Sequence, residues 1–181
     1  TGQILDYQCY RLAHRSIARS TDERTMICTI LSKNVFYSHS LNSSKNFKNL
    51  SDLLVISSIL NSFLYDFFLR QTVSANLTMF FIYQTPVPRI SPNDKQYNEI
   101  IKRAAQLICV TDEFAELWEE TIKTKWTKNC IASESDKIKL RAELDAIIAH
   151  IYGLTKDEFE YILTTFPLVD QKIKDETIRN Y

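Results

Sequence analysis

The stretch from residue 53 to residue 68 constrains the fold most, because its apolar side chains cover more than one face of a helix. Ser51 or Asp52 can cap such a helix, which we expect to run to about Arg70. A helix that is apolar on most sides has to be buried, so other elements must pack around it. The apolar residues of this predicted helix are Leu53, Leu54, Ile56, Ile59, Leu60, Phe63, Leu64, Phe67 and Phe68.

A membrane-spanning segment is the competing interpretation of this stretch. Polar residues such as Asn61 and Asp66 interrupt it, and the run is shorter than the ~20 residues that a bilayer requires. We therefore expect no membrane partner, and a helix that packs on a sheet with part of its surface available to another region of the polypeptide. Because the chain opens with Thr1 and carries no secretory signal pattern, we expect a piece of a longer cytoplasmic protein.

The first half of the chain contains the segments that we expect to form strands. Residues 10–19 and 25–31 predict a hairpin with a charged turn between them, and a third strand is expected at residues 35–41. A further apolar strand is expected at residues 76–83, because Pro86 and Pro88 follow it and proline cannot donate to a sheet.

The second half predicts a series of capped helices. One is expected from Ser91, whose neighbours supply a cap and a first-turn proline, to about Leu107, and another begins near Thr111. Ser133 starts a third, which Gly153 stops. Thr155 and Glu158 form a capping box before a fourth, which Pro167 ends. The last ~12 residues are polar, and we expect them to be frayed.

These elements predict an α+β fold. A small, mainly antiparallel sheet with a buried helix occupies residues 1–90, and a mostly helical segment packed on it occupies residues 91–181.

Motifs for catalysis and metal binding are not found in the sequence. Only two glycines occur, Gly2 and Gly153, so the chain cannot build a glycine-rich loop for a phosphate or a dinucleotide. The three histidines have no partner at a fixed spacing, and the four cysteines are too scattered for a zinc site. We expect no catalytic residue, no metal and no cofactor in this chain, and reduced cysteines.

The net charge of zero conceals an asymmetry between the two halves. Residues 1–90 hold nine Lys or Arg against five Asp or Glu, so a polyanion would be attracted to this half. In the predicted first strand, the alternation of side chains puts Arg11, Arg15 and Arg19 on one face.

A cluster of polar residues at the predicted turn adjoins this arginine face. Guanidinium groups and hydroxyls placed together in this way can reach phosphates or base edges. The alternative is that Asp22 and Glu23 pair with Arg19 and Arg24 across the hairpin and merely fix the turn. The candidate DNA-binding residues are Arg11, Arg15, Arg19, Thr21, Asp22, Glu23, Arg24 and Thr25.

Four motifs in the same order resemble the C-terminal specificity region of type IIG restriction enzymes and related adenine-specific DNA methyltransferases. Residues 10–31, YRLAHRSIARSTDERTMICTIL, resemble the segment of that family with the pattern R-D-I-A-x-x-T-D/N-E-R-T. Residues 60–71, LNSFLYDFFLRQ, resemble its L-N-S-x-x-x-D-Y/F-x-x-R-Q helix. Residues 76–88 are similar to its apolar strand before L-P-V-P, and residues 142–167 to its closing helical segment. This chain differs in Ser16, where the family usually has Asp, in Thr85, where it has Leu, and in Ser74 and Ala75 at a usually glycine-rich turn.

The resemblance implies a target-recognition region that binds double-stranded DNA. It also implies a bacterial restriction-modification parent that transfers a methyl group from S-adenosylmethionine to adenine N6 and that, if it is one of the restriction enzymes of this family, also cuts DNA. The cofactor and the catalytic machinery would then belong to a methyltransferase domain upstream of Thr1. The alternative is a docking module that packs on the methylase core or on a partner subunit without contacting DNA, which the apolar excess of residues 53–68 favours.

Overall fold

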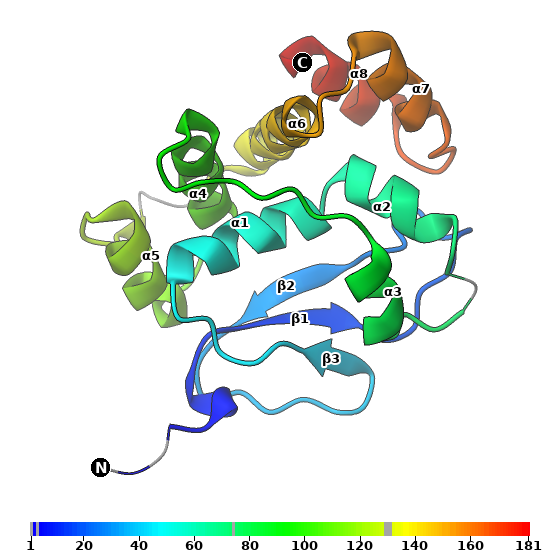
Figure 1. Ribbon diagram of the computed structural model, residues 1–181. Helices are drawn as coiled ribbons and strands as arrows, with labels where there is room; N and C mark the ends of the chain where they lie inside the picture. Colours follow the sequence, from blue (N-terminus) through cyan, green and yellow to red (C-terminus); the bar gives the residue numbers. More distant parts are fainter. Residues whose placement is uncertain (1, 3, 74, 129–131) are drawn as a thin grey trace.

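The N-terminal half is built on a three-stranded antiparallel sheet, as the α+β prediction requires. The computed structural model describes residues 2, 4–73, 75–128 and 132–181. A short 3₁₀ helix, η1 (Asp6–Gln8), precedes the sheet. Strand β1 (Arg11–Arg15) lies in the centre, between β2 (Cys28–Leu31) and β3 (Leu41–Ser43) (Figure 1).

The predicted hairpin is confirmed, but its first strand is shorter than expected. Strand β1 ends at Arg15 instead of continuing to Arg19, and β3 begins where the predicted third strand should have ended. The chain leaves the sheet after Arg15 because its next backbone groups bond elsewhere: Ala18 donates to the carbonyl of Ala75 at 3.1 Å.

The predicted long helix is two helices, and the prediction of one continuous helix was wrong. Helix α1 (Leu50–Leu60) and helix α2 (Phe63–Arg70) meet at a bend of 60°. Asn61 ends α1 and donates its side-chain amide to the carbonyl of Cys28 at 3.1 Å, while Ser62 caps α2 by accepting from the amide of Tyr65. The cap of α1 is Asn49, which lies before the two residues proposed for it.

Helices α1 and α2 supply the centre of the core. Helix α1 lies over the sheet and packs against the two helices that follow it in the second half, α4 (Lys95–Ile108) and α5 (Ala115–Ile122) (Figure 1). Leu53, Leu54, Ile59 and Leu64 are at most 1% exposed. The apolar excess of this stretch is therefore used inside the chain, which removes the feature that favoured docking.

The described helices can be tested as membrane spans by their length and apolar composition. No single helix among them is long and apolar enough to cross a bilayer; α1 and α2 reach the required length and composition only as the bent pair.

The predicted strand at residues 76–83 is wrong, because most of it is helix α3 (Met79–Gln84). Only Asn76 forms a strand-like bridge, with Ile17. A run of six largely apolar residues fits a short helix as well as a strand, and the pattern alone cannot distinguish the two. Phe80 and Tyr83 of α3 are 61% and 79% exposed.

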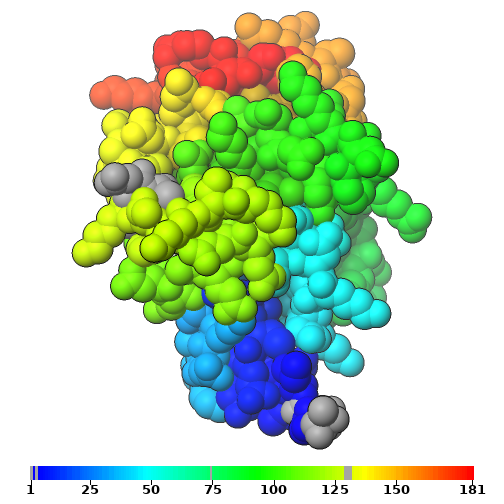
Figure 2. All heavy atoms as spheres, turned by 90° about the vertical axis from the view of Figure 1, so that its left-hand side faces the viewer, coloured from blue at the N-terminus to red at the C-terminus, as the bar shows by residue number. Residues whose placement is uncertain are grey.

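The second half is helical, as predicted, and two of its four predicted caps are confirmed; α4 begins after Asp94, and neither it nor η2 has a side-chain cap bond. A short 3₁₀ helix, η2 (Asp112–Phe114), leads into α5. Ser133 caps α6 (Glu134–Ile151), and Thr155 with Glu158 forms the capping box of α7 (Lys156–Thr164). Gly153, between them, has a φ of +76°. On the face drawn in Figure 2, α4 and α5 occupy the middle, between the blue strands and the orange and red C-terminal helices.

The C-terminal residues are not frayed, so this expectation was wrong. Residues Gln171–Asn180 form α8, which packs on α6. Thr177 is fully buried, and the ring of Tyr181 stacks on His150 with 4.1 Å between the ring centroids. The composition of this segment is polar because only one side of the helix is buried.

Candidate nucleic-acid interface

The polar cluster forms a compact turn over residues 19–25, which we call the 19–25 turn. The amide of Asp22 donates to the carbonyl of Arg19 at 3.1 Å, and the hydroxyl of Thr25 donates to the same carbonyl at 3.1 Å. These bonds direct the middle of the turn outward. The residues exposed on it are Arg19, Ser20, Thr21 and Glu23.

The Asp66 carboxylate holds the end of the 19–25 turn from beneath. This residue of α2 is completely buried. It accepts the backbone amides of Thr25, at 3.0 and 3.1 Å, and of Met26, at 3.2 Å, together with Nε of Arg24 at 2.9 Å. A buried carboxylate with several donors, one of them charged, is compensated for its loss of water.

Arg70 holds the middle of the turn, one helical turn after Asp66. Its Nη2 donates to the carbonyls of Asp22 and Glu23, each at 3.3 Å, and lies 3.8 Å from Asp66. Burial lowers the pKa of the Arg70 guanidinium, while the charge of Asp66 raises it. The guanidinium has no partner with a full negative charge other than Asp66 within the described residues.

Two of the predicted DNA-binding arginines are bound to other parts of the chain, which corrects the expectation of an exposed arginine face. Arg11 is 4% exposed; it donates to the carbonyl of Val35 and lies over the Tyr37 ring. Arg24 lies over the Phe63 ring, 4.3 Å from its centroid, and also donates to the carbonyl of Asn61. The expectation of an open face was wrong because the segment between β2 and β3 covers Arg11, through Val35 and Tyr37.

The remaining predicted site residues differ in exposure. Arg15 is half-exposed and forms an ion pair with Asp22 at 3.0 Å, rather than Asp22 pairing with Arg19 or Arg24. Thr25 is fully buried. Arg19, in contrast, is exposed and forms no ion pair with any residue that the structure describes. Of the four arginines, it is the one most accessible to a phosphate.

A groove of about 570 Å³ lies beside the turn and extends to the C-terminal helices. Its wall includes Arg24, Arg141 and the buried Asp145, whose carboxylate accepts the amide of Phe63 at 2.8 Å. Burial raises the pKa of Asp145 to about 6, although the charge of Arg24 lowers it. The charges on this wall are mixed, so Coulomb attraction does not favour a polyanion there.

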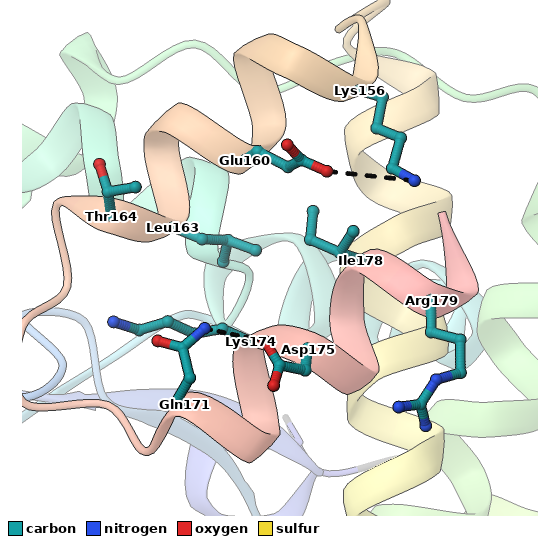
Figure 3. A pocket seen from close by; sticks show the side chains of 9 residues that line it. All are labelled: Lys156, Glu160, Leu163, Thr164, Gln171, Lys174, Asp175, Ile178 and Arg179. Atoms are coloured by element: carbon teal, nitrogen blue, oxygen red, sulfur yellow. Dashed lines mark hydrogen bonds and ion pairs between the residues drawn. The ribbon is translucent and has the colours of Figure 1, made fainter.

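A second groove, of about 600 Å³, lies between α7 and α8 (Figure 3). Lys156 pairs with Glu160, and Gln171 donates to Asp175, in each case one turn along the same helix. Leu163 and Ile178 form its apolar wall. Because most of its charged groups are paired within their own helix, we assign no ligand to it.

The described residues contain no group of three or more His, Cys, Asp or Glu that could hold a metal ion. His14 is buried with its Nδ1 3.2 Å from the carbonyl of Arg15, and burial lowers its pKa. Cys28 is buried, Cys9 is half-buried, and Cys130 lies outside the described residues, as does Ser74 of the predicted turn.

Sequence reasoning missed Asp66 and Arg70, although both lie in a quoted motif. The sequence signal for both was a charged residue inside a strongly apolar stretch. A charge in such a place is rarely buried without a partner, so it predicts an ion pair or a hydrogen-bonded backbone segment nearby. Asp66 was instead interpreted as an interruption of the apolar run.

Comparison with protein-family models, with curated proteins and with solved structures finds no significant match.

Proposed function

We propose that this chain selects the DNA target sequence of a bacterial restriction-modification methyltransferase. The parent would methylate adenine N6 with S-adenosylmethionine. Because the chain has no glycine-rich loop for that cofactor, we assign methyl transfer, and any DNA cleavage, to another region of the polypeptide.

One observation carries this proposal. The two motifs of residues 10–31 and 60–71, which resemble the specificity region of that family, meet in space: Asp66 and Arg70 of the second motif hold the turn of the first. The side chains left free by this support are Arg19, Ser20, Thr21 and Glu23.

The exposed side chains have the chemistry that DNA reading requires. A guanidinium can contact a phosphate or a guanine edge, a hydroxyl can contact either, and a carboxylate can accept from the amino group of cytosine. We place the DNA contacts on Arg19, Thr21 and Glu23. Arg15 and Asp22, which are half-exposed and paired with each other, lie at the edge of this proposed contact surface. We assign Arg11, Arg24 and Thr25 a structural role, because they are buried or paired inside the chain.

Salt-dependent binding to duplex DNA tests the proposal. Phosphate contacts make the logarithm of affinity fall linearly with the logarithm of salt concentration, by ~0.9 for each contact. We expect R19A to weaken binding and to reduce this slope by about one. The matched control is R179A, because Arg179 is an exposed arginine on α8. Absence of binding by the wild-type chain at low salt, or equal slopes for both variants, contradicts the proposal.

A docking module is the second candidate function, and the surface of α3 favours it. Phe80 and Tyr83 present two large exposed aromatic rings, a feature of interaction sites. If the chain is a docking module, the F80A/Y83A double variant fails to associate with the methyltransferase polypeptide, whereas R19A associates normally. The reverse pattern favours DNA recognition.

A further inference from the structure

The C-terminal half contacts the 19–25 turn chiefly through Arg70, while Arg24 of the turn lies farther from the Phe166 ring, at 5.8 Å from its centroid. Arg70 donates Nη2 to the carbonyls of Asp22 and Glu23, and donates Nη1 to the carbonyl of Thr165 at 3.2 Å. Its guanidinium lies over the ring of Phe166, 3.9 Å from the centroid. Residues more than 140 positions apart in sequence are thus joined through a single planar group.

We infer that Arg70 is a positioning residue that makes the conformation of the 19–25 turn depend on Thr165 and Phe166. The segment after α7 then regulates how Arg19, Thr21 and Glu23 are presented. The part of this inference that concerns DNA rests on the proposed function; the part that concerns the turn does not.

Two residues of α2 bind different backbone groups of the turn, and this supports the inference. Asp66 binds amides at the end of the turn, whereas Arg70 binds carbonyls in its middle, so both kinds of backbone group are fixed from one helix. Without Arg70, the middle of the turn would retain the local bond between Asp22 and Arg19. Residues Ser20 and Thr21, which are exposed, could then adopt other conformations.

An arginine is required for this arrangement. Its planar fork presents donors in fixed directions, so one group can bond to carbonyls on two sides while its face stacks on an aromatic ring. A lysine carries the same charge on a flexible stem and cannot do both. The Arg70 side chain is only 7% exposed, so water provides little compensation for lost bonds.

Hydrogen exchange of the full chain tests the positioning role without DNA. In R70K, we expect the amides of Asp22, Thr25 and Met26 to exchange roughly tenfold faster, because bonds to a charged group are lost nearby. The control is R103K, because the ion-pair partners of Arg103 are Glu99 and Glu143, neither of which belongs to the turn. Exchange at the turn that is unchanged in R70K, or equally accelerated in R103K, overturns the inference.

Phe166→Leu is the second variant, because it keeps an apolar side chain in the core while removing the flat face beneath the guanidinium. We expect it to accelerate exchange at the same three amides, in a part of the chain distant in sequence. If F166L folds and leaves the turn amides as protected as in the wild type, the dependence on the C-terminal segment is refuted, even where R70K fails to fold.

Selection from a pool of random duplex DNA tests the consequence for recognition. For F166L we expect enrichment of the preferred sequence to fall roughly tenfold, while the slope of affinity against salt stays that of the wild type, because phosphate contacts carry little sequence information. Equal enrichment by both proteins contradicts the positioning role. If the wild type binds no DNA, the proposed function fails, and the exchange measurements alone decide whether Arg70 positions the turn.

Discussion

Arg24 donates its Nε to the carboxylate of Asp66 across 2.9 Å, and the carboxylate is completely buried. The same two oxygens accept the amides of Thr25 and Met26. One acidic side chain thus fixes both the side chain and the backbone at the end of an exposed turn.

Replacing Asp66 by asparagine should destabilise the chain strongly. The substitution removes the charge opposite Arg24 and Arg70 and directs an amide group toward backbone donors. Breaking a buried pair typically costs ~3–5 kcal/mol, so we expect a loss of about 3 kcal/mol in the free energy of unfolding, measured by urea denaturation. In the control, E99Q, a half-exposed ion pair with Arg103 is lost and the change should stay below about 1 kcal/mol. If D66N and E99Q lose the same free energy of unfolding, the supporting role of Asp66 is contradicted.

Asn61 should resist replacement even by aspartate, which has nearly the same shape. Its amide group donates to the carbonyls of Cys28 and Ser57, and a carboxylate cannot donate either bond. We expect N61D to lose about 2 kcal/mol of stability, with N98D as the control, because Asn98 is exposed on α4. A melting temperature of N61D close to that of the wild type would contradict the role we give to this amide.

Asp145 should make stability fall as pH rises. Its pKa is raised to about 6 in the folded chain, from an ordinary value of 3.8, so the folded state binds more protons than the unfolded state between these values. The favourable contribution is present below pH ~4 and is lost through pH ~6. Unfolding free energies at pH 4.5 and 7 should therefore differ less for D145N than for the wild type, by up to about 2 kcal/mol.

The control for this pH dependence is D157N, because Asp157 is exposed on α7. It should retain the wild-type difference between the two pH values. A D145N variant that keeps the wild-type difference as well would show that another group is responsible.

Gly153 should tolerate no side chain without cost. Its φ of +76° is a conformation that residues with a Cβ rarely adopt, although no atom lies within 4 Å of the position that a Cβ would occupy. We expect G153A to lose about 1–2 kcal/mol through backbone strain alone. Gly2 provides the comparison, because it also has open space around it and no positive φ. Thermal unfolding should therefore be unchanged in G2A.

Features determined by neighbouring residues could be predicted from the sequence. Ser133 and the pair Thr155 and Glu158 were assigned as caps because a hydroxyl or carboxylate acts on backbone groups within one helical turn. The α+β class followed in the same way, from the order of strand and helix patterns.

Features that depend on distant partners could not be predicted. The break after Leu60 depends on the bond between Asn61 and Cys28, which lies on another element. Arg11 was expected on an open face, yet the segment that contains Val35 and Tyr37 covers it, which side-chain alternation within one strand cannot predict. For the candidate site, the turn and its exposed Arg19 were predicted, whereas its support by Asp66 and Arg70 required the fold.

The bond between Asn61 and Cys28 also affects behaviour in concentrated solution. Strand β2 is at the border of the sheet, where unpaired backbone groups invite a strand from another molecule. The amide of Asn61 covers the carbonyl of Cys28, and its oxygen lies 3.4 Å from the nitrogen of Cys28. A side chain there imitates a neighbouring strand, so strand addition from another molecule is hindered where β2 begins.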